Sequence, residues 1–205
     1  MVTTPKKYIL DSVANVVVCR ILIASTRESG SVPMAISAGM LRRERRWELD
    51  YNQLRAATEA PFPCGKDDLV ILYNARYELL ALGRLGWPLP VNILDLRQEI
   101  CEYKGGNIRS IPEAMIAIGL ERKYFYCDPP LELTRDTCPS DTEQYVRRAE
   151  AERVCVVRML DKIKRRLDGQ LRSREALRRG QEARQLVVDA LKIEAMAAQP
   201  GSRLI

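Results

Sequence analysis

Histidine is absent from the whole sequence of 205 residues. This absence excludes Ser-His-Asp and Cys-His nucleophilic catalysis, zinc sites built with imidazole, and histidine general bases. A Walker loop and a Gly-x-Gly-x-x-Gly motif are also missing, so nucleotide-dependent chemistry has no support. Any hydrolysis by this chain would have to rest on carboxylates and metal ions.

The six cysteines include no Cys-x-x-Cys pair. Their scatter argues against a zinc site and against a disulfide scaffold, and it favours buried thiols in a reducing cytoplasm. No apolar run approaches the roughly 20 residues that cross a bilayer, and the N-terminus lacks a signal-peptide layout. We therefore expect a cytoplasmic protein with no membrane partner.

Hydrophobic runs at residues 7–11 and 16–24 predict strands, and residues 32–36 predict an edge strand because Pro33 cannot donate to a ladder. The charged stretch 41–54 reads as a loop that leads into a surface helix. A capping box at Ser110 predicts a short helix that ends at Gly119. Residues 123–139 read as a loop.

Two long helices are predicted near the C-terminus. A second capping box at residues 139–143 opens the first, whose apolar residues recur at three- and four-residue spacing up to Leu167. Gly169 interrupts the pattern, and the second helix covers about 171–197. The two are expected to form an antiparallel hairpin on the sheet, although the last helix could instead serve a partner or nucleic acid.

The most informative segment runs from residue 68 to residue 96. An apolar run at 69–72 predicts a buried strand that delivers Asn74 and Glu78 to the start of a helix, and a second run at 91–94 leads into Asp95. Two-metal nucleases present acidic groups in this way. The segment resembles the second motif of the DnaQ-like 3'–5' exonuclease domains that are fused to phage-type and bacterial family A DNA polymerases.

The resemblance implies two divalent ions, Mg²⁺ or Mn²⁺, held by four acidic groups, of which the first strand supplies two as Asp-x-Glu. Asp11, Glu78 and Glu152 are the candidate catalytic residues and metal ligands. Val13 stands where the family has the glutamate after Asp11. Arg148 stands where one branch of the family has a tyrosine that orients water. The catalytic set is therefore damaged, and weak or lost activity is expected.

Substrate contacts are expected from two regions. The resemblance places Asn74 at the helix start and Arg76 and Tyr77 beside the substrate groove. The formal charge of +6 is concentrated between residues 161 and 184, where nine basic residues face four acids. Clustered arginines favour phosphate contacts, although a solvated, salt-bridged helix surface is equally compatible with them. The candidate nucleic-acid-binding residues here are Arg165, Arg166, Arg172, Arg178 and Arg179.

The resemblance implies an α/β fold, an RNase H-like mixed sheet flanked by helices, with a C-terminal helical hairpin. The expected division is an exonuclease-like domain at 1–169 and a basic helix and tail at 170–205. Three functions stay open. The chain could be an exonuclease on single-stranded DNA or RNA, a non-catalytic nucleic-acid-binding module, or an interaction module that docks a separate DNA polymerase.

Overall fold

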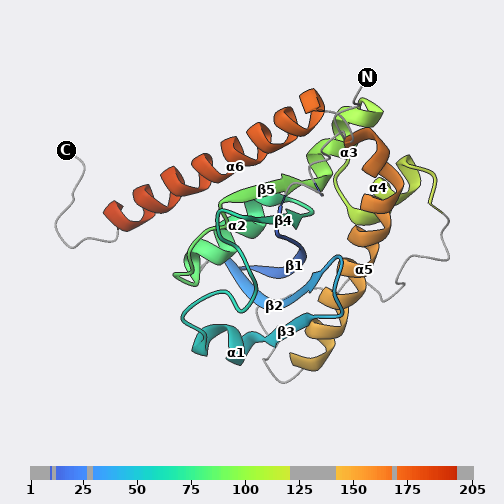
Figure 1. The fold of residues 1–205 in the computed structure, drawn as a ribbon. Coiled ribbons are helices and arrows are strands. Elements are labelled where there is room, and N and C mark those ends of the chain that lie inside the picture. The colour runs from blue at the N-terminus through green and yellow to red at the C-terminus, as the bar shows by residue number, and fades with distance from the viewer. Residues whose placement is uncertain (1–9, 11–12, 27–29, 121–141, 168–169, 198–205) are drawn as a thin grey trace.

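A computed structural model describes residues 10, 13–26, 30–120, 142–167 and 170–197. Within these residues a single mixed sheet is flanked by helices (Figure 1). Its strands are β1 (Asn15–Thr26), β2 (Gly30–Met40), β3 (Arg46–Asp50), β4 (Asp68–Leu72) and β5 (Asn92–Asp95). The helices are α1 (Tyr51–Ala56), α2 (Ala75–Arg84), α3 (Leu96–Lys104), α4 (Ile111–Ala117), α5 (Thr142–Leu167) and α6 (Gln170–Ala197).

The strand order across the sheet is β3-β2-β1-β4-β5. The first three strands pair antiparallel, and β4 and β5 then add in parallel on the other side of β1. This order is compatible with an RNase H-like arrangement. The predicted α/β class, with a mixed sheet and two helices at the C-terminal end, is confirmed.

The N-terminal strands differ from their prediction. The run at 16–24 is confirmed as part of β1, whereas residues 7–9 and 11 of the predicted first strand lie outside the described residues. β2 lies between β1 and β3, but β3 pairs only with residues 35–39 of β2. The predicted edge position is therefore confirmed for residues 32–34, which among the described strands have no partner strand other than β1, and it is wrong for residues 35–36. Pro33 needs no donor towards β3, and it lies at a register shift opposite Ile23.

The true edge strand on that side is β3, which lies inside the stretch predicted to be loop and helix. Only α1 of that stretch is helical. The Asp50 carboxylate accepts from the amide of Gln53, and the Gln53 side chain accepts from the amide of Asp50, which forms a capping box at the start of α1. The predicted loop is confirmed for residues 41–45, which form a turn, whereas the charged side chains of Arg46 and Glu48 lie on the exposed edge strand.

Short helices follow the two parallel strands. Asp95 ends β5 and caps α3, and Gly105 ends that helix in the left-handed conformation that glycine adopts without strain. Ser110 caps α4 by accepting from the amide of Glu113, while the Glu113 carboxylate accepts from the amide of Arg109. The predicted loop at 123–139 and the start of the second capping box at 139–141 lie outside the described residues.

The two faces of the sheet are covered by different helices. α3, α4 and α5 pack on the face that carries Val16, Val18 and Ile71, and α1 and α2 pack on the face that carries Val17 and Val70. α6 runs along the β5 edge towards α2 (Figure 1). A helix in this position covers a strand edge whose backbone would otherwise be open to another chain.

Both C-terminal helices belong to the packed body. Ala176 of α6 joins the cluster beneath α5, and Val187 joins the cluster beneath α2. A side chain at Gly180 would collide with the backbone carbonyl of Ile93, so the helix approaches β5 as closely as backbone allows. The predicted division at residue 169 falls between two helices that both contribute to the cluster of Val16, Val18 and Ile71. Among the described helices, none has the length and apolar character to cross a bilayer.

Candidate functional site

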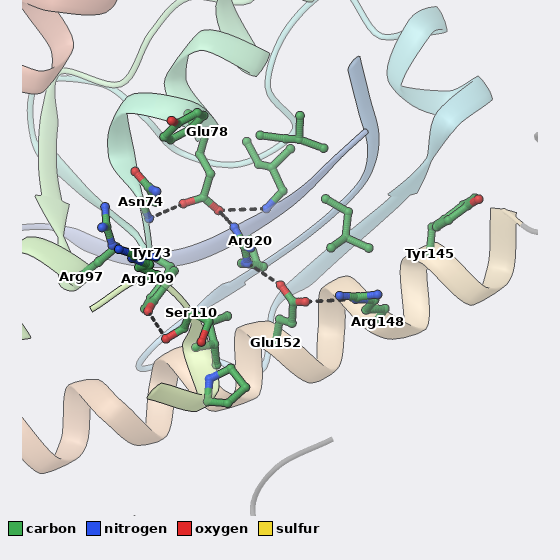
Figure 2. Close-up of a pocket in the computed structure, with 16 residues that line it drawn as sticks. Arg20, Tyr73, Asn74, Glu78, Arg97, Arg109, Ser110, Tyr145, Arg148 and Glu152 are labelled. Carbon is green, nitrogen blue, oxygen red and sulfur yellow. Dashed lines mark hydrogen bonds and ion pairs between the residues drawn. The ribbon is translucent and has the colours of Figure 1, made fainter. Parts of the chain in front are cut away.

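A cleft of about 600 Å³ opens beside α5 (Figure 2). Its floor is β1 from Arg20 to Ile23. The first turn of α2, the start of α4 and one flank of α5 form its walls. Sixteen residues line it, including the predicted site residues Glu78 and Glu152. Elements far apart in sequence thus converge on one polar centre.

Glu78 lies in the first turn of α2 and is fully buried at 0 % exposure. One carboxylate oxygen accepts from the amide of Ile21 at 3.1 Å, and the other accepts from the amide of Asn74 at 2.9 Å. β4 ends at Leu72 and α2 begins at Ala75, with Asn74 as its N-cap, which places the Glu78 carboxylate near the end of the strand. The predicted position of Glu78 at the start of a helix is confirmed.

Arg20 joins the two acidic residues. Its Nη1 lies 2.6 Å from Glu78 Oε1, and its Nε lies 2.7 Å from Glu152 Oε2. The guanidinium also lies over the ring of Tyr73, 5.9 Å from the centroid. Burial disfavours the charged form of Arg20, but the Glu78 and Glu152 carboxylates outweigh that penalty and raise the pKa of the guanidinium above its usual value. Arg20 is therefore a permanent cation between two carboxylates.

Arg148 extends this network along α5. Its Nε donates to Glu152 Oε1 at 3.1 Å, so both oxygens of Glu152 are engaged by arginines. Arg148, Glu152, Arg20 and Glu78 alternate in charge across the cleft (Figure 2). The helical spacing that placed Arg148 and Glu152 one turn apart was readable from sequence, but their pairing with Arg20 was not.

β1 meets the cleft with residues 20–23. Asp11 lies outside the described residues, and Val13 precedes β1. Arg20 and Leu22, two residues apart on β1, line the cleft with a cation and an apolar side chain.

Among the described residues, the donor set of Glu78 and Glu152 does not fit a two-metal site. The oxygens of Glu78 and Glu152 already accept from arginines and backbone amides, and the Arg20 charge between them would repel a divalent ion. In the part of the chain that the structure describes, no group of three or more acidic or cysteine side chains is placed to hold a metal ion. The predicted ligand pair Glu78 and Glu152 is thus brought together, but around a guanidinium.

Other predicted contacts fall partly on the cleft. Asn74 and Tyr77 line it, and Tyr77 is 58 % exposed at its rim. Arg76 is exposed on the same helix but is not among the cleft residues. Sequence reasoning overlooked Arg97 and Arg109, which both line the cleft near Tyr73 (Figure 2). The four arginines of the lining outnumber its two glutamates, so the cleft carries a formal charge of +2.

The wall beside Tyr73 is held by its own contacts. The Tyr73 hydroxyl donates to the carbonyl of Ser110 at 2.6 Å, and the Arg97 guanidinium donates to the carbonyl of Ile108. These bonds fix the segment that carries Arg109. The Arg109 side chain is exposed, and the backbone amide of Arg109 donates a hydrogen bond to the Glu113 carboxylate.

Asp95 lies behind the cleft and supports it. Its carboxylate accepts from the amides of Ala75 and Gln98, which ties the start of α2 to the start of α3. Burial raises the pKa of this carboxyl to about 6, with the nearby Glu78 charge adding to the effect and the two amides opposing it. Asp95, at the end of β5, therefore connects the N-termini of α2 and α3 through hydrogen bonds.

The predicted basic helical surface is partly paired within the protein. Arg179 forms two bonds to the Glu99 carboxylate, at 2.9 and 2.8 Å, and Arg178 pairs with Glu182. The Arg166 guanidinium lies 3.7 Å from the centroid of the Tyr103 ring. Arg165 and Arg172 are exposed. The salt-bridged alternative thus accounts for Arg178 and Arg179.

Comparison of the chain with protein-family models and with curated proteins finds no match.

Proposed function

We propose that this chain is a DnaQ-like domain that holds single-stranded nucleic acid in the cleft without cleaving it. The observation that carries the proposal is the Arg20 guanidinium, which lies between Glu78 and Glu152 where the resemblance would place metal ions. Hydrolysis of this type requires those ions to activate water and stabilise the leaving oxygen. A guanidinium can do neither, but it keeps the centre of the cleft cationic.

The walls of the cleft supply the two contacts that single strands need. Arg97 and Arg109 offer donors to phosphate oxygens on one wall, and the exposed ring of Tyr77 offers a face for a base to stack on. A positive groove with an aromatic platform binds without reading sequence, because every base has a π-face. The size of the cleft suits a small number of nucleotide units.

The test measures binding and cleavage on one 5'-labelled single-stranded oligonucleotide. We expect fluorescence anisotropy to show binding, and we expect the labelled oligonucleotide to keep its full length in the presence of Mn²⁺. Tyr77→Ala and Arg109→Gln should each weaken binding, by roughly tenfold for the lost stacking contact. Arg76→Gln is the matched control, because Arg76 is exposed on the same helix outside the cleft.

Two results would contradict the proposal. Stepwise shortening from the 3' end that disappears in Glu78→Gln would establish a catalytic site. Equal affinity of wild type, Tyr77→Ala and Arg109→Gln would place binding elsewhere on the protein.

A further inference from the structure

The turn between β2 and β3 concentrates positive charge. We name residues 41–46 the arginine turn. It contains one acid, Glu44. All of its arginines are exposed, and they are Arg42, Arg43, Arg45 and Arg46. The turn is held at both ends, because the amide of Met40 donates to the carbonyl of Arg45 at 3.0 Å and the amide of Leu41 donates to the carbonyl of Val16 at 2.8 Å. The turn thus gathers four exposed guanidinium groups, of which Arg46 lies 3.4 Å from the Glu150 carboxylate and Arg45 lies over the Trp47 ring.

A cavity of about 370 Å³ lies between the arginine turn and α5. Arg42, Arg43 and Arg46 line it from the turn, and Arg153 and Val157 line it from the helix. Since Glu44 is the only acid in the lining, the cavity carries a formal charge of +3. This site is distinct from the cleft, with which it shares no residue.

One wall of the cavity is rigid. Arg153 is only 6 % exposed, and its guanidinium donates to the Glu150 carboxylate at 2.7 Å and to the Ser37 hydroxyl at 3.1 Å. Gly39 makes room for it, because a Cβ there would lie 2.7 Å from Arg153 Nη1. The buried Arg153 therefore lines the same cavity as the exposed arginines of the turn.

Protection of the sheet edge is the simpler explanation of these charges. Charged side chains on an edge strand discourage pairing with another chain. That role is served by residues on β3 itself, whereas Arg42, Arg43 and Arg45 lie in the turn before the strand. Arginine is also the side chain whose planar fork matches the oxygens of a phosphate group.

We propose that the arginine turn and its cavity bind backbone phosphates of nucleic acid outside the cleft. The proposal extends the proposed function, because it gives the bound strand a second contact. Arg148 and Glu152 face the cleft from one flank of α5, and Arg153 and Val157 face the cavity from another. A strand that crosses α5 contacts both sites.

The test compares oligonucleotides of about 4 and about 20 nucleotides on the full chain, with affinity measured over a range of salt concentrations. The short probe suits one site, whereas the long probe spans both. Arg42→Gln/Arg43→Gln removes two charges from the turn. Lys66→Gln/Lys192→Gln removes two exposed charges elsewhere and is the matched control.

We expect the turn variant to bind the short probe like the control and the long probe more weakly. The slope of log affinity against log salt is negative, and for the long probe its magnitude should fall by about 1.4, since each single-strand phosphate contact contributes about 0.7. Equal slopes for the turn variant and the control on the long probe would overturn the inference. So would unchanged oligonucleotide affinity together with lost binding to phosphatidylserine vesicles, which would indicate a lipid surface.

The two proposals fail separately. If Tyr77→Ala and Arg109→Gln bind both probes like wild type while the turn variant loses the long probe, the cleft proposal fails and the arginine turn stands. If the cleft variants lose both probes and the turn variant matches its control, the arginine turn fails and the cleft stands.

Discussion

Arg20 Nη1 lies 2.6 Å from Glu78 Oε1, and the same oxygen accepts the amide of Ile21, the next residue along β1. The strand therefore holds the carboxylate of α2 with both its backbone and a charged side chain. A buried ion pair of this kind is sensitive to the loss of either partner, because the remaining charge is left without compensation.

We expect Arg20→Met to lower the free energy of unfolding by about 3–5 kcal/mol, the range for a broken buried pair. Arg20→Met/Glu78→Gln should recover much of that loss, since neither side chain then carries a buried charge. Urea denaturation of the two single variants and the double variant closes the cycle. Additive losses in the double variant would mean that the two side chains are energetically independent.

Divalent ions should bind only after the guanidinium is removed. In Arg20→Asp a third carboxylate joins Glu78 and Glu152, and we expect millimolar Mn²⁺ to raise its Tm by roughly 5 °C, while the Tm of the wild type stays constant. Arg20→Asn is the control, because it also frees the two glutamates but adds no carboxylate. A rise of the same size in the wild type would show that Arg20 does not exclude the ion.

Asp95 should make stability depend on pH. Its pKa of about 6 in the folded protein exceeds the value of about 3.9 in an unfolded chain. The folded state therefore binds the extra proton, and the resulting stability is present at low pH and lost as pH rises through 6. Compared with Asp95→Ser, which keeps a capping oxygen, the wild type should lose about 2 kcal/mol between pH 4.5 and 7.5. A pH-independent difference in denaturation between the two proteins would contradict this assignment.

Tyr145 is fully buried, and its hydroxyl makes no hydrogen bond in the described structure. Removal of an unpaired buried hydroxyl relieves its desolvation cost, so Tyr145→Phe should raise the free energy of unfolding by about 1 kcal/mol. Tyr73→Phe is the opposite case, because it deletes the 2.6 Å bond to the carbonyl of Ser110, and it should lower stability by about 1 kcal/mol. Thermal denaturation of both variants tests the pair, and a loss in Tyr145→Phe would reveal a partner for its hydroxyl.

Gly180→Ala should detach α6 from the sheet edge. In an exposed helix this change usually stabilises by close to 1 kcal/mol, but here the new methyl group meets the backbone carbonyl of Ile93, which cannot rotate away. We expect a loss of about 2–3 kcal/mol in chemical denaturation and faster hydrogen exchange in β5. Gly106→Ala adds a methyl group in open space and should change stability by less than about 0.5 kcal/mol.

Long apolar runs made most of the fold predictable. Residues 69–72 are buried as a continuous strand, and the regular spacing up to Leu167 matches the buried side of α5. β3 lacks an apolar run, but its polar and apolar residues alternate strictly over residues 46–50, and Trp47 and Leu49 pack on the core. This alternation is the local pattern of a half-buried strand, and the charged residues that precede it drew the interpretation towards a loop.

Only part of the candidate site could be predicted from the sequence. Glu78 could be found because it follows a strand end within one turn, a purely local pattern. Arg20 appeared in the sequence as an interruption of an apolar run, since its partners lie 58 and 132 residues away. No local pattern reports a pairing over such distances, and the resemblance directed attention to Asp11.

The cation at the centre of the cleft is part of the polypeptide. It cannot be stripped by a chelator, exchanged for another metal, or diluted away when the protein leaves its surroundings. The charge and shape of this cleft are therefore inherited with the chain itself, and they are the same whatever inorganic ions the medium supplies.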